Sequence, residues 1–83
     1  MYSIIFDKKA VEQINKFEVA TKKRILAKLQ ICKENPFHFL EHLEYIDGYK
    51  LRIGDYRVVA DVDKSLQIIT ILKIGHRKNV YEK

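Results

Sequence analysis

The sequence has few of the residues that cross-link or rigidify a small fold. Its 83 residues include one cysteine, one proline, three glycines and no tryptophan. A lone Cys32 cannot form an internal disulfide, so it is expected to be a small buried residue on a helix, in a fold held by its apolar core. No apolar run is long enough to cross a bilayer, and the first residues lack a signal-peptide pattern, which predicts a cytoplasmic protein with no membrane partner.

Charge, by contrast, is plentiful and unbalanced. Sixteen Lys and Arg stand against eleven Asp and Glu, which gives a formal net charge of +5. This excess favours a polyanionic partner such as nucleic acid or an acidic protein. The chain is 47% hydrophobic and 33% charged, a balance typical of globular proteins. With no repeat or linker, the sequence predicts one domain over residues 1–83.

The spacing of apolar residues predicts an α+β domain with the element order β-α-α-β-β-β. A short strand over residues 2–6 precedes a helix that begins after Asp7, and a second helix runs from about residue 20 to Asn35, before Pro36. The short connection between the helices favours an antiparallel hairpin, packed on one face of a mostly antiparallel four-stranded sheet. The apolar helix positions are Ala10, Val11, Ile14 and Phe17 in the first, and Ile25, Leu26, Leu29 and Cys32 in the second. Helix cations such as Lys23 and Arg24 are expected to be solvated and to affect only affinity for a polyanion.

The clearest local signal is a β-hairpin over residues 49–60. Gly54 and Asp55 lie between two alternating strands and suit a type II′ turn, because glycine adopts a positive φ without steric cost. That turn places Arg52 opposite Arg57, with Lys50 on the same face of the sheet. The other face is apolar and consists of Tyr49, Leu51, Ile53, Tyr56, Val58 and Ala60.

These three cations favour an anion site. Like charges opposite one another destabilise a sheet by up to about 1 kcal/mol, so a purely structural sheet gains nothing from this arrangement. Phosphate is the first candidate, because planar guanidinium groups bind it through two parallel hydrogen bonds. The alternative is a solvated outer face with three ordinary surface charges.

A third strand is predicted from Leu66 to Ile74, after a turn at residues 63–65. It is apolar on both faces, so we expect it inside the sheet, between the N-terminal strand and the hairpin. The short turn predicts that the apolar face is extended by Leu66, Ile68, Thr70, Leu72 and Ile74. It predicts that the basic face, which carries Lys50, Arg52 and Arg57, is extended by Gln67, Ile69, Ile71 and Lys73. Gly75 ends the strand and is followed by His76, Arg77 and Lys78.

The segment from Pro36 to Tyr45 is expected to be a loop with apolar anchors. Within it, residues 38–42 match the H-x-x-E-H string of inverted zinc peptidases. That string belongs inside a long helix, with a third ligand downstream in a much larger domain. We therefore predict no metal site here.

Two stretches together resemble a known family. Residues 48–59 read Gly-Tyr-Lys-Leu-Arg-Ile-Gly-Asp-Tyr-Arg-Val-Val, and residues 74–77 read Ile-Gly-His-Arg, followed by a terminal Val80-Tyr81. With the element order, this pattern resembles the RelE toxins of the RelE/ParE superfamily over nearly the whole chain. The resemblance implies a fold similar to that of small microbial ribonucleases. It also implies a type II toxin-antitoxin toxin that inhibits translation by cutting mRNA in the ribosomal A site.

The resemblance also implies site residues and partners. The catalytic set would be Lys50, Arg52, Arg57, Arg77 and Tyr81. The substrate-binding set would be Lys50, Arg52, Arg57, Lys73, His76 and Lys78. No cofactor is implied. The expected partners are the ribosome, mRNA and an acidic RelB-like antitoxin, in a heterotetrameric toxin-antitoxin complex.

The implied reaction is attack of a ribose 2′-hydroxyl on the adjacent phosphate, which leaves a 2′,3′-cyclic phosphate and a 5′-hydroxyl. Lys50 is the candidate base, Arg57 and Arg77 would hold the phosphate, and Tyr81 would stack on an RNA base. Arg77 or an intervening group would protonate the departing oxygen. The basic face is predicted to carry no paired His and Glu, so electrostatic stabilisation is expected to dominate.

Two other functions stay open at this point. A ParE-like toxin would inhibit DNA gyrase by binding it, with no nuclease site. A noncatalytic basic module would bind RNA without cutting it. The combination of sheet cations with Arg77 and Tyr81 favours the endonuclease, because a gyrase inhibitor needs no such set.

Overall fold

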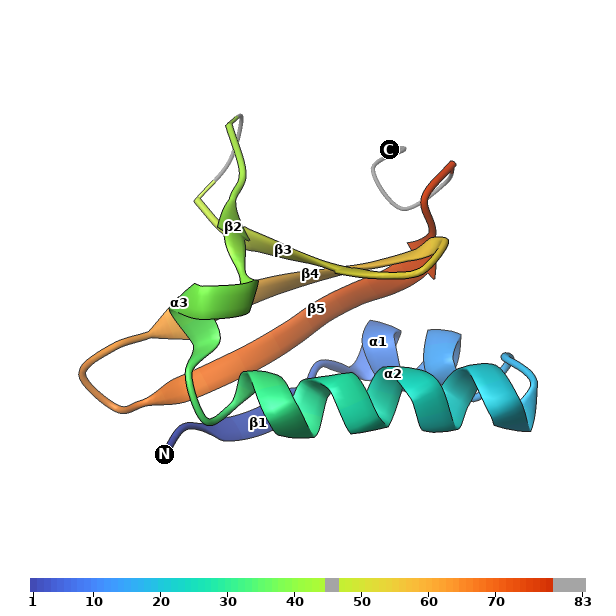
Figure 1. The fold of residues 1–83 in the computed structure, drawn as a ribbon, viewed down its shortest axis with the longest axis horizontal. Coiled ribbons are helices and arrows are strands. Elements are labelled where there is room, and N and C mark those ends of the chain that lie inside the picture. Colours follow the sequence, from blue (N-terminus) through green and yellow to red (C-terminus); the bar gives the residue numbers. More distant parts are fainter. Residues whose placement is uncertain (45–46, 79–83) are drawn as a thin grey trace.

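The computed structural model describes residues 1–44 and 47–78, which form a single sheet and three helices. In chain order the elements are β1 (Ser3–Phe6), α1 (Lys8–Ile14), α2 (Val19–Cys32), α3 (Pro36–Phe39), β2 (Glu41–His42), β3 (Tyr49–Ile53), β4 (Tyr56–Asp63) and β5 (Ile68–His76). The strands form one sheet in the order β1-β5-β4-β3-β2. α1 and α2 lie on the same side of it (Figure 1). The predicted α+β class is confirmed.

The position of the last strand is also as predicted. β5 lies between β1 and β4, parallel to β1 and antiparallel to β4. The side chains of a central strand are shielded by those of the strands on either side. The run of apolar residues in β5 agrees with this central position. The sheet is therefore antiparallel except at the β1–β5 pair.

The sheet has five strands, whereas the sequence predicted four. The segment after Pro36 was expected to be a loop, but it contains the short helix α3 and then β2, which pairs Glu41 with Lys50 and His42 with Tyr49. Proline suits the first turn of α3, because the amide it lacks would have no helical acceptor there. A two-residue strand has no periodicity of its own, so only pairing with β3 reveals it.

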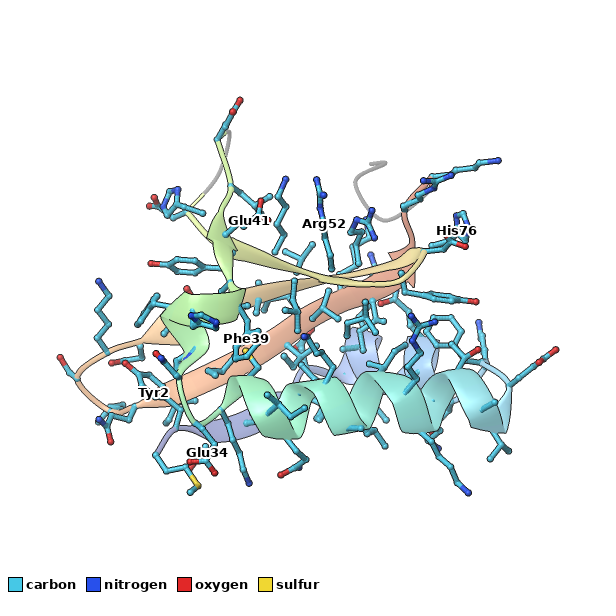
Figure 2. The ribbon with its side chains drawn as sticks, viewed as in Figure 1. Tyr2, Glu34, Phe39, Glu41, Arg52 and His76 are labelled. Atoms are coloured by element: carbon cyan, nitrogen blue, oxygen red, sulfur yellow. The ribbon has the colours of Figure 1, made fainter. Side chains whose placement is uncertain are left out.

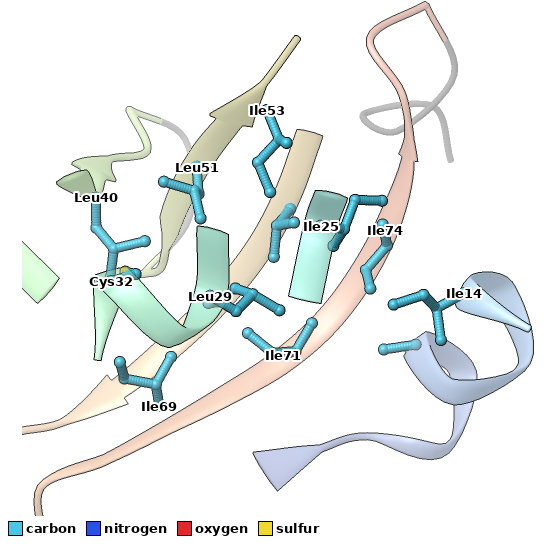
Figure 3. Close-up of a cluster of buried hydrophobic side chains, with 13 residues drawn as sticks. Ile14, Ile25, Leu29, Cys32, Leu40, Leu51, Ile53, Ile69, Ile71 and Ile74 are labelled. Carbon is cyan, nitrogen blue, oxygen red and sulfur yellow. The ribbon is translucent and has the colours of Figure 1, made fainter. Parts of the chain in front are cut away.

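The core lies between the sheet and the helices. Ile25, Leu29 and Cys32 of α2 and Ile14 of α1 are buried against the sheet, and Figure 3 shows them beside Leu51, Ile53, Ile69, Ile71 and Ile74. Two of the apolar helix positions that the sequence indicated lie outside the core, because Val11 is 41% exposed and Leu26 is 37% exposed. Cys32 is buried as predicted, and burial raises the pKa of its thiol, so the thiol stays protonated and inert.

The predicted face of β5 is wrong over most of its length. Ile69 and Ile71 are buried in the core, whereas Leu66 is 69% exposed in the preceding turn. The turn is longer than predicted: the Asp63 carboxylate accepts a hydrogen bond from the Leu66 amide at 2.9 Å, and Gln67 adopts a φ of 55°. The longer turn shifts the pairing by one residue and exchanges the two faces.

A β-bulge then restores the predicted face. Ala60 pairs with Ile71 but Val59 pairs with Lys73, so Leu72 is an extra residue in β5. Beyond the bulge, Ile74 is buried in the core as predicted, and Lys73 lies across from Val59, on the face that carries Lys50. The bulge therefore keeps a lysine out of the core.

None of the helices in residues 1–44 and 47–78 has the length and apolar character that a membrane span requires.

Candidate functional site

The sheet face opposite α1 and α2 carries the predicted cations in two rows. The first row runs across four strands as Glu41, Lys50, Val59 and Lys73. The second row is Arg52, Arg57 and Gly75. In Figure 2, Arg52 points away from the helices. We call Lys50, Arg52, Arg57 and Lys73 the basic face.

The hairpin register that defines this face is confirmed. Arg52 pairs with Arg57 and Lys50 with Val59, as the Gly54-Asp55 turn predicts. Gly54 takes a φ of 60°, the positive value expected at the first central position of a type II′ turn. The side chains of a cross-strand pair leave the sheet roughly 5 Å apart at Cβ, so the two guanidinium groups can reach one anion.

Arg57 folds back over the turn. Its Nη1 donates to the carbonyl oxygens of Gly54 and Tyr56, each at 2.8 Å. A guanidinium has five N–H donors, and five minus these two leaves three for a ligand. The hydrogen bonds fix the orientation of the group, so less side-chain entropy is lost when it binds an anion.

Arg77 approaches the same turn from the end of β5. Its backbone amide donates to the Asp55 carbonyl at 2.7 Å, and its Nε lies 4.0 Å from Asp55 Oδ1. Both side chains are more than half exposed, so this ion pair contributes little to stability. The structure therefore brings Arg57 and Arg77 together around residues 54 and 55.

Lys50 has a carboxylate beside it. Its Nζ lies 3.7 Å from Glu41 Oε2, and the Lys50 side chain is only 27% exposed. β2 thus brings to the basic face a carboxylate, Glu41, that the sequence did not place there. His42, the next residue, packs edge-on against Tyr49 at a centroid distance of 5.3 Å. Sequence reasoning missed Glu41 because it placed this segment in a loop.

The other predicted site residues are His76, Lys78 and Tyr81. His76 is half-buried at the end of β5, where its ring packs edge-on against Tyr56 at 5.8 Å and its Nδ1 accepts the Lys78 amide at 3.2 Å. The Lys78 side chain is exposed. Tyr81 lies outside the described residues.

The H-x-x-E-H string does not form a metal site in this structure. His38 belongs to α3, whereas Glu41 and His42 belong to β2. Across residues 1–44 and 47–78, no three His, Cys, Asp or Glu side chains lie together as metal ligands would.

The conformation of Gly54 and its close contact with Arg24 predict that a side chain at this position destabilises the fold. A Cβ at Gly54 would lie 2.7 Å from Arg24 Nη2, and the left-handed backbone adds roughly 1–2 kcal/mol for any L side chain. Gly54→Ala is therefore expected to lower the free energy of unfolding by about 2 kcal/mol, measured by urea denaturation. Gly48→Ala is the matched control, since its Cβ would have only ordinary contacts, at 3.4 and 3.7 Å. Equal losses in the two variants would contradict this role of Gly54.

The chain is similar in fold to solved structures of RelE toxins and their complexes. The chain is 29% identical to a chain of the archaeal RelE-RelB complex from Pyrococcus horikoshii OT3, with a TM-score of 0.80 over 95% of this chain and 98% of that one. It is 25% identical to a chain of the intact E. coli RelBE toxin-antitoxin complex, with a TM-score of 0.77 over 92% and 96% of the two chains. The fold is thus that of RelE-like toxins.

A family model identifies the chain itself. Residues 4–81 match the model of the ParE toxin of the type II toxin-antitoxin system parDE, and the chain belongs to this family of the RelE/ParE superfamily. No curated protein sequence matches the chain significantly. The chain is therefore a RelE-like toxin of a type II toxin-antitoxin system, as the resemblance predicted.

Proposed function

We propose that this toxin is a cytoplasmic, ribosome-dependent mRNA endonuclease that inhibits translation by cutting mRNA in the A site. The observation that supports the proposal is the Arg52–Arg57 pair on the basic face, with Lys50 and Lys73 in the neighbouring row. Guanidinium groups in this arrangement can bind the scissile phosphate and stabilise the charge that develops on it in the transition state.

The chemistry assigned to these residues is an internal transfer. The ribose 2′-oxygen attacks the adjacent phosphorus, the bond from phosphorus to the 5′-oxygen breaks, and a 2′,3′-cyclic phosphate and a 5′-hydroxyl remain. Lys50 in its neutral form, or Glu41 beside it, would accept the proton of the 2′-hydroxyl. Arg57 and Arg77 would bind the phosphate oxygens, and Arg77 or an intervening group would protonate the 5′-oxygen. Tyr81 would stack on a base.

The proposed partners follow from charge and from relatives. The P. horikoshii and E. coli relatives were solved as RelE-RelB and RelBE complexes. For this chain we propose an acidic RelB-like antitoxin in a heterotetrameric complex, with the ribosome and mRNA as the targets of the free toxin. The net charge of +5 suits both an acidic protein and RNA.

Primer extension on a defined mRNA in a translating extract tests the endonuclease. We expect cuts inside A-site codons that require ribosomes and that fall at least roughly 100-fold with Arg77→Ala, because one donor to the developing charge is lost. Arg77 is exposed, so this variant should unfold at the parent's urea concentration. The matched control is Lys64→Ala, an exposed lysine in the turn before β5. Intact mRNA, or cleavage by Arg77→Ala at the parent rate, would contradict the proposal.

The match to the ParE toxin model favours a second candidate, which is inhibition of DNA gyrase by binding. It predicts arrested growth with intact mRNA and gyrase-linked DNA breaks. An RNA-binding module without nuclease activity would bind the mRNA and cut it neither with nor without ribosomes. The same extract, with an added assay for gyrase-linked breaks, separates the three outcomes.

A further inference from the structure

Arg24 of α2 occupies the space that a side chain at Gly54 would fill. The ideal Cβ position at Gly54 lies 2.7 Å from Arg24 Nη2, 2.8 Å from Nη1 and 2.9 Å from Cζ. Three nearly equal distances mean that the guanidinium lies with its flat side against the glycine. Its N–H donors then point outward in the plane of the group, toward solvent or a ligand.

Three arginines, from α2, from β4 and from the residue after β5, thus surround one two-residue turn. Arg24 contacts Gly54 from α2, Arg57 of β4 donates to the Gly54 carbonyl, and Arg77 donates its amide to Asp55. Figure 1 shows this turn, between β3 and β4, above the N-terminal half of α2.

Carboxylates to balance these arginines are scarce. Asp55 is the one acidic residue of the turn, and it is 4.0 Å from Arg77 Nε. α2 reads Val-Ala-Thr-Lys-Lys-Arg-Ile-Leu-Ala-Lys-Leu-Gln-Ile-Cys and has no acidic residue. In the part of the chain that the structure describes, the Arg24 side chain has no hydrogen bond or ion pair. Since like charges repel, a bound anion would stabilise this arrangement.

An open depression of about 290 Å³ lies beside Arg24. Its lining is Arg24, Ala27, Lys28, Ile31, Ile53 and Gly54. The side chains of Ala27, Ile31 and Ile53 make it apolar, with one cation on α2 at Arg24 and another at Lys28. An apolar surface flanked by cations suits a nucleotide, whose sugar and base are less polar than its phosphate.

We propose that Arg24 and this depression form a second RNA-binding subsite, which takes the phosphodiester and sugar of a nucleotide next to the one cleaved at the basic face. The inference rests on the proposed endonuclease function. The two subsites meet at Gly54. Arg57 donates to the carbonyl oxygen of Gly54, and the guanidinium of Arg24 lies where a Cβ on this residue would be. A single RNA strand whose scissile phosphate is held by Arg57 passes around the turn and places its next phosphate on Arg24.

The test is the binding of a single-stranded RNA decamer, made non-cleavable by 2′-O-methylation, measured by fluorescence anisotropy over a series of salt concentrations. Each phosphate contact to a single strand contributes about 0.7 to the slope of log affinity against log salt. Arg24→Gln is expected to reduce this slope by about 0.7 and to weaken binding about tenfold at low salt. Arg24→Lys keeps the charge without the flat guanidinium and should restore the slope.

The control is Lys23→Gln, which removes one charge from the neighbouring exposed position of α2. It should leave the slope unchanged, and melting temperatures should show that every variant is folded. An unchanged slope for Arg24→Gln, equal effects of Arg24→Gln and Lys23→Gln, or no binding by the parent would overturn the subsite. So would an effect of Arg24→Gln on binding of a decaglutamate peptide alone, which would indicate a site for an acidic protein.

Ribosome-dependent cleavage by the same proteins separates this inference from the proposed function. If the parent cuts mRNA and Arg24→Gln cuts it with the same KM, the subsite is wrong while the endonuclease stands. If the parent does not cut, the endonuclease is wrong, and the salt slope still decides whether Arg24 binds a phosphate.

Discussion

Arg57→Ala is expected to lower the rate of ribosome-dependent mRNA cleavage by roughly 10²–10³-fold. Removal of one fixed donor to a developing oxyanion has effects of this size in other enzymes. Arg57 is fixed before substrate arrives, because its Nη1 donates to two carbonyl oxygens of the turn at 2.8 Å. Single-turnover cleavage of an mRNA placed in the A site measures the effect without interference from product release.

The same change also affects the fold, so stability must be measured alongside. Loss of the two hydrogen bonds to the turn should lower the free energy of unfolding by about 1 kcal/mol, since the turn is partly exposed. Arg57→Lys is the matched control, as it keeps the charge but loses the planar fork, and its cleavage rate should lie between those of the parent and Arg57→Ala. A folded Arg57→Ala protein that cuts within tenfold of the parent rate would remove Arg57 from the reaction.

Ile69→Ala is expected to lower the free energy of unfolding by about 2–5 kcal/mol. Ile69 is 1% exposed in the core, and truncation there removes buried methyl and methylene groups and leaves a cavity. Native proteins are only marginally stable, so a loss of this size is a large part of the total free energy of unfolding. Urea denaturation monitored by circular dichroism gives the value.

Ile68→Ala is the matched control, because it removes the same atoms from the preceding residue of the same strand. Ile68 is only partly buried, and it pairs with Asp63 at the end of β4. Its truncation should therefore have a clearly smaller effect than that of Ile69. The sequence alone predicted the reverse order, with Ile68 on the core face. A greater loss for Ile68→Ala would show that β5 pairs in the register the sequence predicted.

The two hairpins explain why one prediction of register was right and the other was wrong. At Gly54, the residue that the turn requires appears in the sequence itself, because glycine is suited to the positive φ of a type II′ turn. Around residues 63–67 there is no glycine. The length of that turn is determined by the hydrogen bond that the Asp63 carboxylate accepts and by the positive φ of Gln67, and a residue pattern reveals neither.

The residues of the candidate site likewise fall into those that the sequence predicted and those that it missed. Local register places Lys50, Arg52 and Arg57 on one face, and the sequence predicted this correctly. Glu41 and Arg24 come to the site from other elements, Glu41 through the pairing of β2 with β3 and Arg24 through the packing of α2 on the turn. No periodicity reports such contacts, because they depend on how the whole sheet and the helices are assembled.

The sequence by itself determined the α+β class, the central position of β5, the hairpin and its cluster of cations. Each of these follows from local chemistry: apolar spacing, strand alternation and the backbone freedom of one glycine. Only the tertiary structure shows the fifth strand and the bulge at Leu72. It alone also places the carboxylate of Glu41 beside Lys50 and the guanidinium of Arg24 against Gly54. These features arise from pairing and packing between different elements, whose energies override what any one segment favours alone.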